Sequence, residues 1–153
     1  MDLDAILARL DQLETHERIR ALIADYAFAA DTQDFELLGS VFAPDAVMDM
    51  GGTILEGRES IVSTMASILT SDFVAKHFIV NEKITWTSGT PHTRAYVNYT
   101  HAGPGVSAVG WGTYDIDFTA DGSQVTRMIF AGNQHLPGTV PEAMARIDDM
   151  KGA

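Results

Sequence analysis

Three side chains that can hold or move a proton carry most of the chemical information in this sequence. Tyr26 and Asp31 lie five residues apart at the end of an apolar segment, and His77 follows downstream. A phenol and a carboxylate in apolar surroundings cost free energy unless another group pairs with them or uses them. Histidine exchanges protons near neutral pH, so the three together indicate a proton-transfer site. A carboxylate beside an imidazole makes it a usable base, so we expect Asp31 and His77 to lie together.

Helical periodicity positions the first two of these residues. Residues 3–13 predict a first amphipathic helix, and Thr15 is the expected N-cap of a second helix. Within the second helix, Tyr26 lies near the centre of the apolar stripe and Asp31 at its margin. Both side chains are therefore expected to reach the buried side, whereas Asp25 points away.

The remaining chain changes from a helical to an alternating pattern. The predicted elements are a short helix from Asp34 to Phe42, a strand over 46–50, a helix over 59–69, four strands from His77 to Asn133, and a last short helix over 141–150. The strands are separated by turn residues rich in glycine, proline and aspartate. Helices followed by hairpin-linked strands predict the α+β class with an antiparallel sheet, and residues 1–153 fit one domain.

Three motifs occur in a familiar order: IRALIADYAFAAD over 19–31, FAPDAV over 42–47 and EGR over 56–58. Together with the histidine at the start of a long strand, they resemble the SnoaL-like proteins of the nuclear transport factor two superfamily. The scytalone dehydratase and bile acid dehydratase type is the most similar. The resemblance covers nearly all of 19–133. It implies a cone-shaped barrel, in which a curved antiparallel sheet wraps around helices and leaves a deep apolar pocket.

The resemblance also implies roles for single residues. Tyr26, Asp31 and His77 match the catalytic tyrosine, aspartate and histidine of the dehydratases. His101 matches a second pocket histidine, although a core histidine with its hydrogen bonds satisfied is the competing interpretation. Asn133, on the last strand, is the other polar residue expected in the pocket.

Two apolar residues complete the predicted substrate contacts. Met48 belongs to a set of methionines that suit a malleable lining, and ordinary core packing explains them equally well. Trp111 lies on a strand with large apolar groups on both faces, one of which is expected to line the pocket. The other histidines, His16, His92 and His135, are expected to be solvated.

Composition limits the classes of molecule that this chain is expected to bind. The chain carries a net charge of -11, which repels nucleic acids and anionic membranes, and its apolar stretches are too short to span a bilayer. It has no cysteine, and its histidines lack the spacing of a shared metal site, so we expect neither a metal nor a cofactor. The acidic start does not read as a signal peptide, and a cytoplasmic location is the default expectation.

These observations favour a cofactor-independent lyase, a dehydratase that acts on a hydrophobic ring compound with a carbonyl group. The same residues would serve a double-bond isomerase or a polyketide cyclase, because each reaction begins by deprotonating carbon next to a carbonyl. A non-catalytic ligand carrier or assembly module is the alternative from another class. Apolar groups on both faces of the third and fourth strands predict a homodimer through the outer sheet face, with a homotrimer as the alternative.

Overall fold

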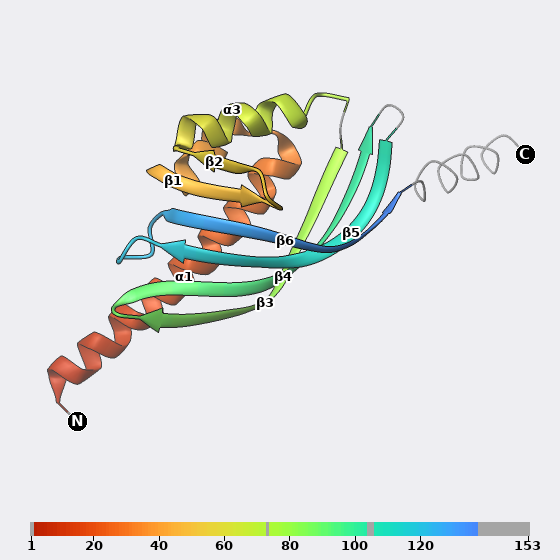
Figure 1. The fold of residues 1–153 in the computed structure, drawn as a ribbon. Coiled ribbons are helices and arrows are strands. Elements are labelled where there is room, and N and C mark those ends of the chain that lie inside the picture. The colour runs from red at the N-terminus through yellow and green to blue at the C-terminus, as the bar shows by residue number, and fades with distance from the viewer. Residues whose placement is uncertain (1, 73, 104–105, 138–153) are drawn as a thin grey trace, which may run out of the picture.

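The computed structural model describes residues 2–72, 74–103 and 106–137, without the side chains of residues 106 and 133–137. In chain order, the elements are α1 (Leu3–Thr32), α2 (Phe35–Val41), β1 (Phe42–Met50), β2 (Ile54–Glu56), α3 (Arg58–Ile68), β3 (Val74–Thr87), β4 (Thr90–Gly103), β5 (Val106–Phe118) and β6 (Val125–Pro137) (Figure 1). This order confirms the predicted α+β class. The helix predicted over residues 141–150 lies outside the described residues.

The first helix is longer than the sequence pattern suggests. Two helices separated by a cap at Thr15 were expected, but α1 runs without a break through that residue. Thr15 is buried, and its methyl group lies against Gly122 in the turn between β5 and β6, so the side chain serves packing rather than capping. Asp2 caps the helix instead, and Gln33 ends it in the left-handed conformation at φ 59°.

Two short helices follow and are tied to the sheet. Asp34 caps α2 as predicted, because its side chain accepts a hydrogen bond of 2.9 Å from the Leu37 N–H. Arg58, at the start of α3, donates from Nε to the Phe42 carbonyl at 2.8 Å. The EGR segment therefore fixes α3 against the beginning of β1.

The six strands form one sheet in the order β2-β1-β6-β5-β4-β3. Four of the five neighbouring pairs are antiparallel, but β1 and β6 are parallel, with Met48 opposite Met128. The prediction of a wholly antiparallel sheet is wrong at this pair, because β1 joins a strand that lies about eighty residues further along the chain. With β2 and β3 as its edges, the sheet is curved but does not close into a barrel.

The long strands bend, and the helices gather on one side of the bend (Figure 1). Helix α1 contacts β3, while α3 contacts β1 and β2. The core between them is apolar; its largest fully buried side chains are Tyr26, Phe42, Phe118, Ile19, Leu38, Met48, Ile61, Ile116 and Met128. No helix in the described part of the chain is long and apolar enough to span a membrane.

Candidate active site

The end of α1 and the first part of β3 bring Asp31 and His77 into contact. Asp31 Oδ1 lies 2.7 Å from His77 Nδ1, and the same carboxylate accepts from the His77 backbone N–H at 3.1 and 3.2 Å. The neighbouring Lys76 places Nζ 3.8 Å from Asp31 Oδ2. The side chains of Asp31 and His77 are only 8% and 9% exposed. The carboxylate thus holds both the ring and the backbone of His77.

This contact determines which nitrogen of His77 is available. When the ring is neutral, Nδ1–H donates to the carboxylate of Asp31, and Nε2 keeps its lone pair. His77 also lines a mostly apolar cavity of about 280 Å³. Its ring can therefore accept a proton from a molecule in the cavity while Asp31 stabilises the imidazolium that forms.

Two tyrosines face each other in the same cavity. The hydroxyl oxygens of Tyr26, from α1, and Tyr114, from β5, lie 3.2 Å apart, and both side chains are buried. Burial raises the pKa of Tyr26, and it raises the pKa of Tyr114 well above the usual tyrosine range. Both phenols therefore keep their protons at physiological pH and can donate hydrogen bonds.

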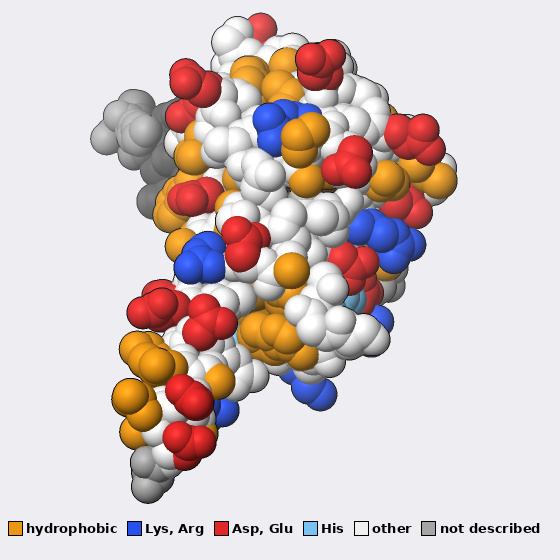
Figure 2. Space-filling model, turned by 90° about the vertical axis from the view of Figure 1, so that its left-hand side faces the viewer, with side chains coloured by type: hydrophobic (Ala, Val, Ile, Leu, Met, Phe, Trp, Pro, Cys, Tyr) orange, Lys and Arg blue, Asp and Glu red, His pale blue; other side chains and the backbone are white. Residues whose placement is uncertain are grey.

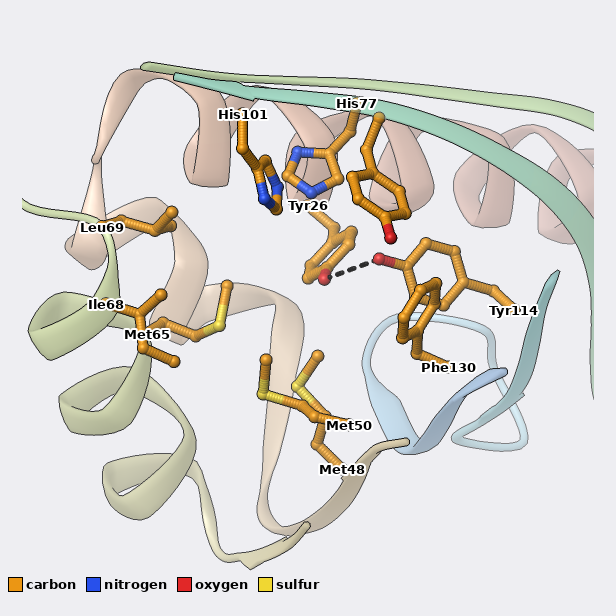
Figure 3. A pocket seen from close by; sticks show the side chains of 11 residues that line it. Tyr26, Met48, Met50, Met65, Ile68, Leu69, His77, His101, Tyr114 and Phe130 are labelled. Carbon is orange, nitrogen blue, oxygen red and sulfur yellow. Dashed lines mark hydrogen bonds between the residues drawn. The ribbon is translucent and has the colours of Figure 1, made fainter. Parts of the chain in front are cut away.

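The cavity measures about 280 Å³ and has a polar end and an apolar end (Figure 3). Its lining residues are Tyr26, Met48, Met50, Met65, Ile68, Leu69, His77, Tyr99, His101, Tyr114 and Phe130. The histidines and tyrosines gather beneath the long strands, whereas the methionines, Ile68 and Leu69 lie across the space from them (Figure 3). Such a mixture, a few polar groups in a mostly apolar wall, is typical of small-molecule sites.

His101 extends the polar end of the cavity. Its ring centroid lies 5.8 Å from that of His77 and 4.9 Å from that of Tyr99, and all three residues line the cavity. Burial raises the pKa of Tyr99. Because His101 belongs to the cavity wall, the structure gives it the position that the resemblance implied, while its role stays a prediction.

Two glycines of β5 make room for this wall. A Cβ at Gly110 would overlap the ring of Tyr99, and a Cβ at Gly112 would overlap the Ala131 carbonyl and the edge of Phe130. Both rings occupy space next to the β5 backbone that any larger residue would fill.

The other predicted substrate contacts have different outcomes. Met48 lines the cavity and is almost fully buried. Trp111 is half-buried, and the alternation along β5 turns it to the face opposite Tyr114, so it does not line the cavity. Asn133 lies in β6, in the part whose side chains are not described. Sequence reasoning missed Tyr99, although it alternates with His101 on one strand face, and it missed Tyr114 because Trp111, on the opposite face of β5, was expected to line the pocket.

Two histidines predicted to be solvated are engaged elsewhere. His16 stacks on Trp86 with ring centroids 4.8 Å apart, and His92 Nδ1 lies 2.7 Å from Asp117 Oδ1. The prediction is wrong for His16, whose Nε2 is buried, because β3 brings Trp86 to a residue that looks isolated in the sequence; the His92 side chain is 32% exposed. The side chain of His135 lies outside the described ones. Among the described residues, no group of three or more His, Asp and Glu side chains is arranged to hold a metal ion.

Comparisons with known proteins extend these findings. A family model described as the SnoaL-like domain matches residues 11–126. No curated protein matches the chain significantly.

Solved structures share the fold. The chain is similar to a candidate aromatic ring hydroxylase from Novosphingobium aromaticivorans, at 25% identity and a TM-score of 0.69, over 82% of this chain and 94% of that one. It is also similar to a candidate scytalone dehydratase from the same organism, at 20% identity and a TM-score of 0.72, over 85% and 91%. A third similar structure, hexachlorocyclohexane dehydrochlorinase (LinA) type 2, has 18% identity and a TM-score of 0.73, over 86% and 94%.

Proposed function

Because the chain belongs to the SnoaL-like domain family, we propose that it is a cofactor-independent lyase, a dehydratase for a hydrophobic ring compound with a carbonyl group. The observation that carries the proposal is the contact of 2.7 Å between His77 Nδ1 and Asp31 Oδ1 at the wall of an apolar cavity. A buried imidazole oriented by a carboxylate is a general base.

The proposed reaction is an elimination of water. His77 Nε2 takes a proton from the carbon next to the carbonyl, and the electron pair of that C–H bond forms a carbon–carbon double bond. The hydroxyl on the adjacent carbon leaves, receives the proton from the His77 imidazolium and departs as water. No external oxidant, reductant or cofactor enters this balance.

The tyrosine pair supports the same step. Negative charge develops on the carbonyl oxygen when the neighbouring carbon loses its proton. Tyr26 and Tyr114 are protonated donors on the cavity wall, and one of them can donate to the carbonyl oxygen while the other holds the first in place. Their apolar surroundings strengthen such a hydrogen bond relative to water.

Cavity size favours a small substrate. At about 280 Å³, the space lies just below the range of roughly 300–1,000 Å³ that is usual for drug-sized ligands. A compound with one or two rings therefore fits better than a four-ring steroid. The methionine side chains at the apolar end can adapt to the ring.

Other reactions use the same first step. A double-bond isomerase and a polyketide cyclase also begin with a proton taken next to a carbonyl, and a dehydrochlorinase expels chloride in place of hydroxide. A carrier would need only the apolar cavity. The test must therefore detect the proton abstraction itself.

We would incubate the protein in D₂O with a panel of one- and two-ring hydroxyketones and follow both deuterium exchange next to the carbonyl and loss of water. Elimination by the wild type and its loss in His77→Gln would support the dehydratase. Exchange without elimination would support an isomerase or a cyclase. Binding without exchange or elimination would contradict the proposal in favour of a carrier.

A further inference from the structure

The pair of Asp31 and His77 lies between two hollows of the protein. His77 lines the cavity described above, and both residues line a second hollow, the α1–β3 groove of about 320 Å³. Other walls of the groove are formed by Arg20, Ala27, Phe28, Phe78 and Glu82. Asp31 is not part of the cavity wall. Charges outside the cavity can therefore act on the base through Asp31 without touching the substrate.

Lys76 is such a charge. Its Nζ lies 3.8 Å from Asp31 Oδ2, while His77 Nδ1 lies 2.7 Å from Asp31 Oδ1. The Lys76 side chain is 53% exposed and does not line the cavity. The carboxylate of Asp31 thus faces the imidazole with one oxygen and an ammonium group with the other.

This arrangement opposes protonation of His77. The ammonium of Lys76 is charged throughout the acidic and neutral range, so an imidazolium at His77 would be a second positive charge on the same carboxylate. Two cations that share one anion also repel each other, and a nearby like charge disfavours the charged form of a group. Lys76 therefore favours the neutral ring, which is the form that can take a proton.

The charge of the whole protein acts in the other direction. The chain carries a net charge of -11, and Asp and Glu side chains are spread over the face shown in Figure 2, with fewer Lys and Arg side chains among them. An excess of negative charge favours protonated histidine. A positive charge beside Asp31 offsets this effect locally.

The other ionisable groups around the pair do not replace Lys76. Arg20 and Glu82, in the groove, lie 3.7 Å apart and offset each other. On the cavity side, the ring centroid of His101 lies 5.8 Å from that of His77. The remaining groups on that side are tyrosines that burial keeps protonated and uncharged: Tyr26, Tyr99 and Tyr114.

We propose that Lys76 is a positioning residue for the base, which acts through Asp31 and keeps His77 neutral to lower pH than Asp31 alone would allow. This inference rests on the proposed function, in which the neutral ring takes the proton from the substrate. It places control of the base on a side chain that the substrate does not contact.

The first test is the pH profile of Lys76→Met, which removes the charge and keeps an unbranched side chain. The midpoint of the acid limb of kcat should move to higher pH by roughly half a pH unit, as expected for a partly exposed ion pair. The shift should become smaller in concentrated salt, because salt screens exposed charges. KM at neutral pH should stay the same, since Lys76 lies outside the cavity.

Two variants are matched controls. Lys76→Arg keeps the positive charge and should retain the wild-type acid limb. Lys83→Met removes the same charge from an exposed position on the same strand, roughly 20 Å further along, and should also leave the acid limb in place. Lys76 and Lys83 are exposed, so circular dichroism should show intact folding in all three variants.

The second test needs no substrate and so separates this inference from the proposed reaction. NMR of protein with ¹⁵N-labelled histidine follows protonation of the His77 ring, and His77→Gln identifies its signals. The midpoint should shift upward in Lys76→Met by the same amount as the acid limb. Such a shift without turnover of any ring ketone would support the role of Lys76 and contradict the dehydratase.

Three outcomes would overturn the inference. One is a His77 titration that is the same in wild type and Lys76→Met, even if turnover falls. Another is a downward shift in Lys76→Met. The third is an equal shift in Lys83→Met, because it would assign the effect to total charge and not to the contact with Asp31.

Discussion

Asp31 holds His77 at two points, the ring nitrogen Nδ1 and the backbone N–H, with its two carboxylate oxygens. The ring cannot turn without losing the first contact, and the strand cannot shift without losing the second. Orientation of the imidazole is thus built into the junction between α1 and β3. The predictions below follow from this junction and from the tyrosine pair beside it.

Asp31→Asn should abolish most of the activity while the protein stays folded. An amide cannot stabilise the imidazolium as a carboxylate does, so we expect turnover to fall by about 10²–10⁴-fold. Turnover on the substrate found in the panel and the melting temperature should be measured together. Asp25→Asn is the control, because Asp25 is on the same helix but does not line the cavity. Equal turnover in folded Asp31→Asn would exclude the pair as the base.

Activity should decrease on acidification before the protein unfolds. Protonated His77 has no lone pair with which to accept the proton of the substrate, so only the neutral ring is competent. Initial rates measured from neutral to acidic pH, with folding followed by circular dichroism, provide the check. A rate that stays constant while the protein remains folded would point to another base.

Removing one phenol should weaken catalysis without emptying the cavity. Tyr26→Phe retains the ring but loses the hydrogen bond of 3.2 Å to Tyr114 and one donor to the carbonyl oxygen. Loss of such a donor typically lowers kcat by about 10²–10³-fold. Tyr96→Phe is the control, since Tyr96 is 57% exposed. A kcat unaffected by both Tyr26→Phe and Tyr114→Phe would remove the tyrosine pair from the mechanism.

The buried phenols should also make stability depend on alkaline pH. Their pKa values are raised from the ordinary 10.0, so above that pH the unfolded chain loses protons that the native protein keeps. The free energy of unfolding is therefore unaffected below this pH and decreases above it, by up to about 1.4 kcal/mol per pH unit for each tyrosine. Urea unfolding at several pH values on both sides of pH 10 gives the free energy of unfolding as a function of pH. Above pH 10, the slope of this free energy against pH should be smaller for Tyr114→Phe than for the wild type. An unchanged slope would mean that Tyr114 ionises equally in both states.

Chelator treatment should leave activity intact. The proposed mechanism uses only protein side chains to move the proton and to stabilise charge. Rates measured before and after incubation with a strong chelator, and again after adding divalent ions, make the comparison. Loss of activity that a divalent ion restores would contradict the mechanism.

The sequence predicted the elements of the site better than their partners. Asp31 and His77 could be expected to meet because a carboxylate at a helix end needs a partner and the family resemblance supplied one. The contact between Tyr26 and Tyr114 joins residues 88 positions apart, and the sequence did not predict it, because Trp111 rather than Tyr114 was expected to face the pocket. The parallel pairing of β1 with β6 was also not predicted, because the two strands lie about eighty residues apart in the chain. Local patterns determine which side a residue faces, whereas register across the sheet determines what it meets.

The predicted boundary between two N-terminal helices was wrong for a related reason. A threonine followed by an apolar segment reads as a cap, but burial of Thr15 against Gly122 favours a continuous helix over a break. That packing partner lies more than a hundred residues away and leaves no trace in the local pattern. His16, the next residue, was assigned to solvent for the same reason.

The glycines of β5 separate two properties that many sites combine. The groups that move the proton come from α1 and β3, while the space beside them is set by atoms that Gly110 and Gly112 lack. A methyl group added at Gly110 would displace the Tyr99 ring, and so would change the shape of the cavity while leaving Asp31 and His77 in place. Substitutions on β5 would therefore change the substrate that is accepted, while the proton-transfer groups on α1 and β3 stay the same.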